Sequence, residues 1–381
     1  MSQPFLSIII PIKVTNNNQY LLSRLKDLLY QFDKQNFTNL EYVVVDSSDN
    51  KNSSAKIRDI TSACIKSNYF HFNLTNPYSA AKARNNAANH SLGVYLLFYD
   101  VDLIVKDDFI EKVFSHIKDL KTKSYKAFEI YPCLYLSESK TKEIEGKNIK
   151  DTAFEEIKQR YLEGFNNEVL YLAVNTSTIL VNKEHFFDIG AYDETYKGHG
   201  YEDFELIHRL YMAYPIIERG DDYILDYKTN FPTQYKGFRK YYAYYALKNF
   251  FQGVYTMHLW HPRPLSGKYY RHRSTNKQYF LRQLHNSLKL PLSNQYLDKS
   301  LSRDLSLHIN SLLSSYGYDR KKYCGLNNLN PDNVAIKNKN IFQRKLRKLL
   351  LHPIQFFIDM KFIYREYFTA TFTKLICYII K

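Results

Sequence analysis

The chain has 381 residues, of which 45% are hydrophobic and 24% charged, with only 12 Gly and 11 Pro. This composition excludes a disordered or collagen-like protein and is sufficient for a packed core in one large or two modest domains. The net charge of +15 is unevenly distributed: residues 231–290 contain eleven Lys or Arg and no carboxylate, and residues 341–381 contain eight basic and two acidic residues. Two separate basic segments favour local anionic partners, such as phosphates, acidic glycans or membrane lipids, over a protein that is basic throughout.

The cysteines and the N-terminus indicate a reducing compartment. Cys64, Cys133, Cys324 and Cys377 are far apart and form no CxxC pair, so neither a zinc knuckle nor a disulfide framework is predicted. The first residues lack the basic region and the cleavage site of a signal peptide. Since no apolar run approaches the ~18 residues that span a bilayer, we expect a cytoplasmic protein that is not integral to a membrane.

Strands and helices alternate in the first hundred residues. Apolar, β-branched runs predict buried strands, and helically patterned segments lie between them: strands at 7–10, 42–45 and 94–99, helices at 21–32 and 79–89. This order predicts an α/β fold with a mainly parallel central sheet. Ligands of such sheets bind beyond the carboxyl ends of the strands, where Lys13, Asp46 and Asp100 fall.

Further elements are predicted beyond residue 125. They are strands at 127–136 and 169–181, a loop at Gly198-His199-Gly200, a helix from Glu202, and helical segments after about residue 275. From Ile341 onward, large apolar side chains alternate with Arg and Lys. This pattern predicts a basic amphipathic helix that is kinked or broken at Pro353.

Two groups of residues could hold a metal ion. Asp100 and Asp102 follow a very apolar strand, and carboxylates at such a place suit Mg²⁺ or Mn²⁺ bridging a diphosphate. The same pair could simply end the strand and cap a helix. His258 and His261 could complete a metal shell, although two histidines three residues apart are also common as structural side chains.

A second pair of carboxylates, Glu202 and Asp203, follows the glycine loop. They could cap the helix, or they could present a general base to a bound hydroxyl while the glycines let the loop close over substrate. Arg263 and Arg271 in the basic segment would suit a pyrophosphate or an acidic polymer, and a solvated basic face is the alternative.

Together these residues resemble bacterial family 2 type glycosyltransferases of the GT-A fold, especially those of capsule and surface-polysaccharide synthesis. The resemblance covers roughly residues 5–275. Four motifs match the nucleotide-sugar half and one long segment looks like a galactosyltransferase-type acceptor half: Ser7–Pro11, Val43–Ser47, Ala83–Asn85, Tyr99–Asp102, and residues 187–210. The resemblance implies a GT-A domain, a helical region and a basic tail, at residues 1–275 (halves 1–125 and 126–275), 276–340 and 341–381.

The resemblance also implies roles for individual residues. Asp102 would ligate the metal, helped by Asp100, His261 and His258; Asp203 would be the base and Glu202 would position the acceptor sugar; Pro11, Asp46, Ser48, Arg84, Asp100, Arg263 and Arg271 would bind the nucleotide sugar. The sequence departs from the family pattern at Asp46-Ser47-Ser48, where many members have Asp-Asp-Gly-Ser. It departs again at Tyr201, where Gly or Ala is usual.

The implied activity is a metal-dependent, inverting transfer of a hexose or N-acetylhexosamine. The donor would be a UDP-sugar with Mn²⁺ or Mg²⁺, and the acceptor a growing capsular or other surface polysaccharide, including anionic ones. The basic tail would dock on the inner membrane or on a capsule export complex, which makes the enzyme cytoplasmic and peripherally membrane-associated.

Two other classes stay open. A nucleotidyltransferase usually has a Gly-rich phosphate loop after its first strand, but here no glycine occurs before Gly93. The other class is an inactive sugar- or polyanion-binding protein on the same scaffold, which would have no need to retain all four of Asp100, Asp102, Asp203 and His261. Nucleic acid is not an expected partner.

Overall fold

The computed structural model describes most of the chain up to residue 326. The described residues are 5–74, 78–147, 149–165, 167–227, 229, 231–262, 268–319, 322–323 and 325–326, with 346, 349–350, 353–354 and 356–357. Arg263 and most of the expected basic tail at 341–381 lie outside these residues.

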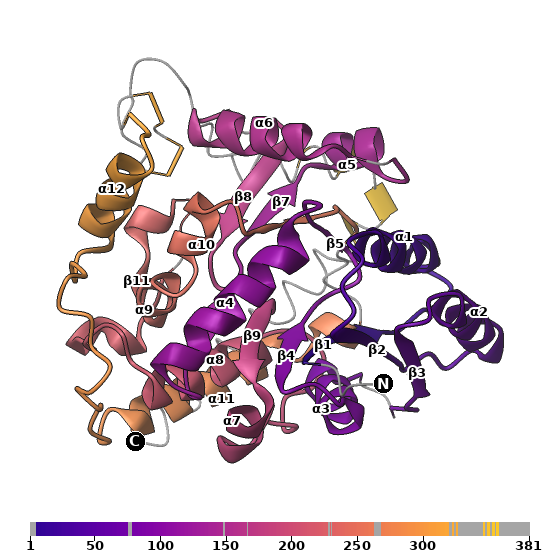
Figure 1. The fold of residues 1–381 in the computed structure, drawn as a ribbon, viewed down its shortest axis with the longest axis horizontal. Helices are drawn as coiled ribbons and strands as arrows, with labels where there is room; N and C mark the ends of the chain where they lie inside the picture. Colours follow the sequence, from indigo (N-terminus) through magenta and orange to yellow (C-terminus); the bar gives the residue numbers. More distant parts are fainter. Residues whose placement is uncertain are drawn as a thin grey trace.

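A six-stranded sheet lies at the centre of the molecule (Figure 1). Its order is β3-β2-β1-β4-β9-β6; the first four strands are parallel, and β9 is antiparallel to both of its neighbours. The strands are β1 (Leu6–Ile12), β2 (Leu40–Asp46), β3 (Ser67–His71), β4 (Tyr95–Phe98), β6 (Phe128–Ile130) and β9 (Ile179–Asn182). The predicted α/β fold with a mainly parallel sheet is confirmed.

Both faces of this sheet are covered, which explains why its strands are continuously apolar. Successive residues of a strand point to opposite faces, so Ile8 and Ile10 of β1 lie in one core while Ile9 lies in the other. The first core also contains side chains of α1, α2 and α4, and the second those of α3 and α8. These helices are α1 (Tyr20–Lys34), α2 (Lys51–Ser62), α3 (Ala80–His90), α4 (Phe109–Lys123) and α8 (Glu202–Ala213).

A second, four-stranded sheet has the order β5-β12-β7-β8. Its strands are β5 (Leu103–Ile104), β7 (Cys133–Leu136), β8 (Val169–Ala173) and β12 (Thr256–His258). Strands do form in both predicted runs, 127–136 and 169–181, but each run divides into two strands that join different sheets. In the first run the break falls at Pro132, which has no N–H to donate to a ladder.

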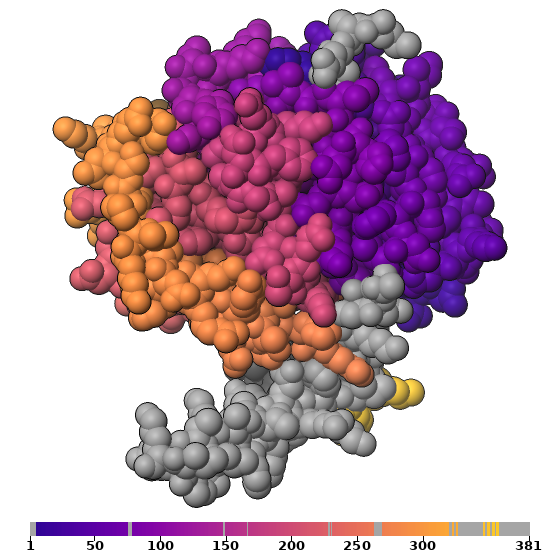
Figure 2. All heavy atoms as spheres, turned by 90° about the horizontal axis from the view of Figure 1, so that it is seen from below, coloured from indigo at the N-terminus to yellow at the C-terminus, as the bar shows by residue number. Residues whose placement is uncertain are grey.

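The remaining elements surround the two sheets. They are α5 (Glu138–Ile144), α6 (Asp151–Leu162), α7 (Lys183–Asp188), α9 (Phe238–Ala243), α10 (Leu247–Phe251), α11 (Arg273–Ser287), α12 (Leu305–Ser315), the hairpin β10 (Asp226–Tyr227) and β11 (Lys236–Gly237), and the 3-10 turns η1 (Asp221–Ile224), η2 (Pro232–Gln234) and η3 (Lys268–Tyr270). Figure 2 shows the N-terminal part and the later part of the chain packed directly against each other. Among the described residues, no helix has the length and apolar character to cross a membrane.

Candidate active site

The turn after β4 directs two neighbouring carboxylates to different partners. Asp100 accepts hydrogen bonds from Arg84 Nη2 at 2.9 Å and from Ser177 Oγ at 2.6 Å. Asp102 instead faces two histidines. Among the described residues, the group that could hold a metal ion contains Asp102 but not Asp100. A metal contact of Asp100 therefore stays a prediction.

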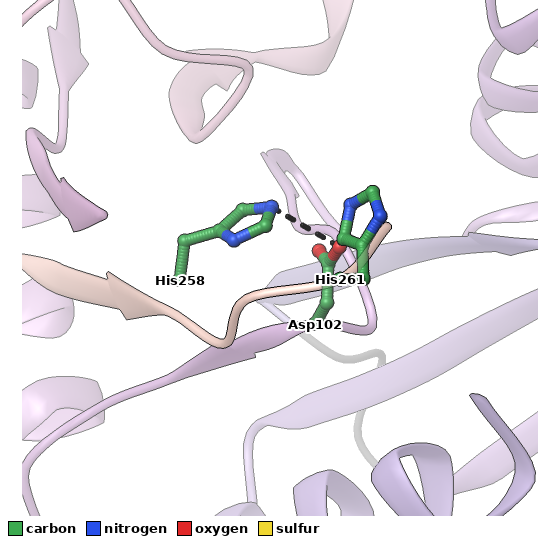
Figure 3. A group of neighbouring side chains, drawn as sticks. All are labelled: Asp102, His258 and His261. Carbon is green, nitrogen blue, oxygen red and sulfur yellow. Dashed lines mark ion pairs between the residues drawn. The ribbon is translucent and has the colours of Figure 1, made fainter. Parts of the chain in front are cut away.

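Asp102, His258 and His261 form a compact cluster (Figure 3). The Nε2 atoms of His258 and His261 each lie 3.1 Å from Asp102 Oδ2, and one ligand atom from each residue lies within 4.8 Å of the other two. Burial alone would raise the pKa of Asp102, but the two imidazoles hold it well below its usual range. One carboxylate and two imidazoles fit a divalent cation, and nitrogen ligands favour a transition-metal ion such as Mn²⁺ over Mg²⁺.

Strand pairing brings these distant segments together. β12 pairs antiparallel with β5, so that His258 lies opposite Leu103. One residue further, Leu259 N donates to Asp102 O at 2.9 Å. The register of this short ladder therefore sets the approach of the histidines to Asp102.

Arg84 connects the strand end to helix α8. It lies on α3, whose N-cap Ser79 accepts a hydrogen bond from Lys82 N, and it is 3% exposed. Its guanidinium donates to Asp100 and also, from Nη1, to Asp203 Oδ1 at 2.8 Å. Burial would lower the pKa of Arg84, but the charge of Asp203, with smaller contributions from Tyr192 and Asp100, raises it well above its usual range. Arg84 is thus a fixed cation between two carboxylates.

Glu202 and Asp203 begin α8 and differ in their surroundings. Glu202 is buried, and its Oε2 has no hydrogen-bond partner among the described residues. Burial, and then the charge of Asp203, raise the pKa of Glu202 to about 8. Burial also raises the pKa of Asp203, but Arg84 opposes this. Burial thus favours the protonated form of Glu202, while the ion pair with Arg84 favours the charged form of Asp203. The role of Asp203 as the base stays a prediction.

The glycine loop before α8 is held in place, which does not support the expected closing motion. Asn276 Nδ2 on α11 donates to Lys197 O and to Gly200 O, both at 2.9 Å. Gly198 N donates to Tyr78 O, and Gly198 has a φ of +65°. A Cβ on Gly198 would lie 2.3 Å from the carbonyl oxygen of Tyr269, so this glycine is needed for close packing.

Tyr201 occupies a position where the family pattern has Gly or Ala, and its side chain makes a contact that neither residue could make. Its backbone is left-handed, with φ +78°, a conformation that glycine adopts without cost and that strains a tyrosine by about 1 kcal/mol. The ring is buried and its hydroxyl donates to Asp226 Oδ2 at 2.8 Å. Tyr201 therefore anchors the start of α8.

The residues at the end of β2 are buried and mutually bonded. Asp46 is fully buried; its Oδ1 accepts from Ser48 N and its Oδ2 from Tyr69 Oη. Ser48 Oγ in turn accepts from Val14 N, directly after β1 with its Pro11. These contacts give Asp46 a structural role in holding the loop after β2, and its contact with a nucleotide stays a prediction.

Part of the basic segment is neutralised inside the fold. Asp226 pairs with Arg239 at 2.7 Å and with Lys277 at 2.8 Å, and Asp222 pairs with Lys240. Arg271 is exposed, and no contact with the site is shown for it. The local excess of positive charge is therefore smaller than the sequence indicates.

Three contributors to the site were not predicted from the sequence. Ser177 Oγ donates to Asp100, and Tyr192 Oη donates to Asp203 Oδ1 at 3.3 Å. Arg24 donates to the backbone carbonyls of the two residues between His258 and His261. Ser177 and Arg24 lie 77 or more positions from the residues they contact. No local pattern marks them, because only the tertiary fold brings them to the site.

The buried Glu202 leads to a prediction about stability. The folded protein binds its proton more tightly than the unfolded chain, so the free energy of unfolding falls as the pH rises from about 4.5 to about 8. Glu202→Gln removes this loss. We expect its melting temperature to exceed that of the wild type by about 3–5 °C at pH 8 and to equal it near pH 4.5. A difference that does not change with pH in thermal unfolding would contradict the assignment.

Comparisons with known proteins identify a family match and a set of similar structures. A family model described as "Glycosyltransferase like family 2" matches residues 7–286. A search of curated proteins returned no match. Among solved structures, S. aureus TarS 1–349 is 18% identical with a TM-score of 0.36, covering 55% of this chain and 56% of that chain.

Two other structures of the same S. aureus protein are similar to this chain. S. aureus TarS, with a TM-score of 0.36, is 18% identical over 55% of this chain and 34% of that chain. TarS 1–349 in complex with UDP-GlcNAc is 15% identical over 82% of this chain and 80% of that chain, again with a TM-score of 0.36. The first two matches thus span about half or less of those chains, and TM-scores this low transfer neither structural detail nor substrate.

Proposed function

The chain belongs to the glycosyltransferase-like family 2, and from this premise we propose that it transfers a hexose or N-acetylhexosamine from a UDP-sugar to a growing bacterial capsular or other surface polysaccharide. The reaction would be metal-dependent and would invert the anomeric carbon. Residues 1–125 would bind the nucleotide sugar and residues 126–275 the acceptor. One observation carries the proposal: Arg84 joins the strand-end Asp100 to Asp203, while Asp102 of the same turn joins the two histidines.

On the donor side, Asp102, His258 and His261 would hold the divalent ion. When bound, such an ion neutralises charge on a leaving diphosphate. Two imidazoles in the ligand set lead us to propose Mn²⁺ over Mg²⁺. Arg84 keeps Asp100 in place beside this cluster, and the nucleotide contacts of Pro11, Asp46, Ser48 and Arg271 remain predictions.

On the acceptor side, Asp203 would take the proton of the attacking hydroxyl. The described hydrogen bonds from Arg84 and Tyr192 both reach Oδ1 of Asp203, which leaves Oδ2 to accept the proton. A base opposite the leaving group supports a single displacement with inversion. Protonated Glu202 could donate a hydrogen bond to the acceptor sugar.

The test is the release of UDP from a panel of UDP-sugars in Mn²⁺, in Mg²⁺ and after chelation, followed by NMR of the product anomer. We expect one donor to be used, with Mn²⁺ more effective than Mg²⁺, loss of activity on chelation, and recovery when Mn²⁺ is added back. An inverted anomer in the product supports the single displacement. Absence of turnover together with absence of UDP binding in Mn²⁺ by calorimetry would contradict the proposal.

The tail at 341–381 is proposed to dock on the membrane surface or on an export complex. Four of its described side chains are large, apolar and exposed, and they recur at helical spacing: Leu346, Leu350, Ile354 and Phe357. Four basic residues, Arg344, Lys345, Arg347 and Lys348, flank the first of them in the sequence. Deleting residues 341–381 is expected to move the protein from the membrane fraction to the supernatant without loss of donor hydrolysis. Persistent sedimentation with membranes would contradict the docking role.

A further inference from the structure

The two residues between the histidines are completely bonded through their backbones. Leu259 N donates to Asp102 O, and Trp260 N donates to Thr141 Oγ1 at 2.8 Å. The carbonyl oxygens of Leu259 and Trp260 accept from the guanidinium of Arg24 at 3.4 and 2.9 Å. Every backbone donor and acceptor of this dipeptide therefore has a partner, and both acceptors depend on one side chain.

Arg24 is built into this place. It lies on α1 and is 5% exposed, and its Nε donates to Glu145 Oε1 at 2.7 Å. The guanidinium carbon also lies 4.6 Å from the centre of the Tyr20 ring, and that ring stacks with His261 at a centroid distance of 6.3 Å. A buried arginine is costly unless its charge and donors are satisfied, and here Glu145, two carbonyls and an aromatic face satisfy them.

We propose that Arg24 is a positioning residue for the metal site: it fixes the backbone between His258 and His261, so that both imidazoles converge on Asp102. The inference rests on the proposed function, because it assumes that these three residues hold a divalent ion. Arginine suits the task since its planar fork reaches two carbonyls and a carboxylate at once, which a lysine ammonium cannot do with the same geometry. Metal binding thereby depends on α1, an element of the first half of the chain that supplies no ligand to the cluster.

If Arg24 served only as a structural crosslink between α1 and residues 258–261, replacing it would lower stability without changing metal affinity. Groups that orient metal ligands typically contribute 10–100-fold to metal affinity. We therefore expect Arg24→Met to weaken binding of Mn²⁺ alone about 10-fold or more, measured by the electron paramagnetic resonance signal of free Mn²⁺. Arg24→Lys should weaken it by a smaller factor, as should Thr141→Val, which removes only the partner of Trp260 N.

Arg219 offers a matched control. Its guanidinium donates to the carbonyls of Ser287, Leu288 and Leu290, the same kind of clamp at a place that holds no metal ligand. Arg219→Met is expected to lower the melting temperature and to leave Mn²⁺ affinity unchanged.

The outcomes separate the inference from the proposed function. Failure of the wild type to bind Mn²⁺ would overturn the proposed metal site itself. Binding by the wild type, loss of binding in Asp102→Ala and unchanged affinity in a folded Arg24→Met would overturn the role of Arg24 alone. If Arg24→Met does not fold, Arg24→Lys and Thr141→Val decide: wild-type affinity in both overturns the inference.

Discussion

Replacing Asp102 by alanine is expected to abolish metal-dependent turnover, lowering kcat/KM for the UDP-sugar by about a thousandfold. Asp102 Oδ2 is the atom that both histidines approach at 3.1 Å, and it is the only carboxylate in the cluster. Without it, His258 and His261 would offer two neutral donors, too few to hold a divalent ion against water. The measurement is steady-state transfer with Mn²⁺ titrated from micromolar to millimolar, together with direct Mn²⁺ binding.

A matched control separates this effect from a general loss of negative charge. Asp107 lies close to Asp102 in the sequence, and its half-exposed carboxylate pairs with Lys34. Asp107→Ala should retain wild-type turnover and metal affinity, because exposed ion pairs contribute little. Substantial turnover of Asp102→Ala at saturating Mn²⁺, or its full activity in a chelator, would show that the cluster does not serve the reaction.

The parallel part of the fold could be predicted from the sequence because its strands are buried on both faces. β1, β2 and β4 are short apolar runs, each bounded by polar or turn residues, and they have little alternative to a covered sheet. β3 escaped prediction because Ser67–His71 is an edge strand with mixed polarity. α2 escaped prediction because Ile57 and Ile60 are its only large apolar residues.

The division of the runs at 127–136 and 169–181 into separate strands was missed for a different reason. Hydrophobicity does not say which sheet a strand joins, and each run changes from one sheet to the other partway along. The same ambiguity explains why the number of sheets was not predicted. Only pairing partners far along the chain, such as β12 for β5 and β7, establish the second sheet.

The candidate site also contains residues that could be predicted from the sequence and residues that could not. Asp102, His258 and His261 were grouped from residue type and motif order, and the structure places them together. Asp100 was grouped with them because a sequence pattern cannot tell which way each carboxylate turns after a strand. Arg24 could not be predicted, because its role depends on backbone carbonyls that carry no sequence signal.

Charge balance couples the turn after β4, which contains Asp100, to the start of α8, which contains Glu202 and Asp203. Asp203 is partly buried beside the buried Glu202 and close to Asp100. This arrangement is unfavourable for three ionised carboxylates. Arg84 supplies one buried positive charge that contacts two of them, and protonation of Glu202 removes a further negative charge. The turn after β4 and the start of α8 therefore share one counter-ion, so a change at either place alters the electrostatics of the other.

Asp203→Asn is expected to lower kcat for transfer by about a thousandfold while leaving UDP and Mn²⁺ affinity near wild-type values. Asparagine keeps the shape of the side chain and an oxygen that can accept from Arg84, but it cannot take the proton of the acceptor hydroxyl. The measurement is transfer to acceptor under saturating donor, with calorimetric binding of UDP in Mn²⁺ on the same preparations. Tyr192→Phe is the matched control, since it removes a hydrogen bond to Asp203 Oδ1 and keeps the carboxylate.

The two variants distinguish a base from an ion-pair partner. If Asp203 removes the acceptor proton, Tyr192→Phe should lose no more than about tenfold, while Asp203→Asn should still release UDP slowly by donor hydrolysis, where water is the acceptor. If Asp203 only balances the charge of Arg84, asparagine should weaken UDP and Mn²⁺ binding together with transfer, because Asp100 and Asp102 lie on the same turn and Arg84 orients the first of them. Equal loss of binding and of turnover would therefore move the base to another group and leave Asp203 as the counter-ion of Arg84.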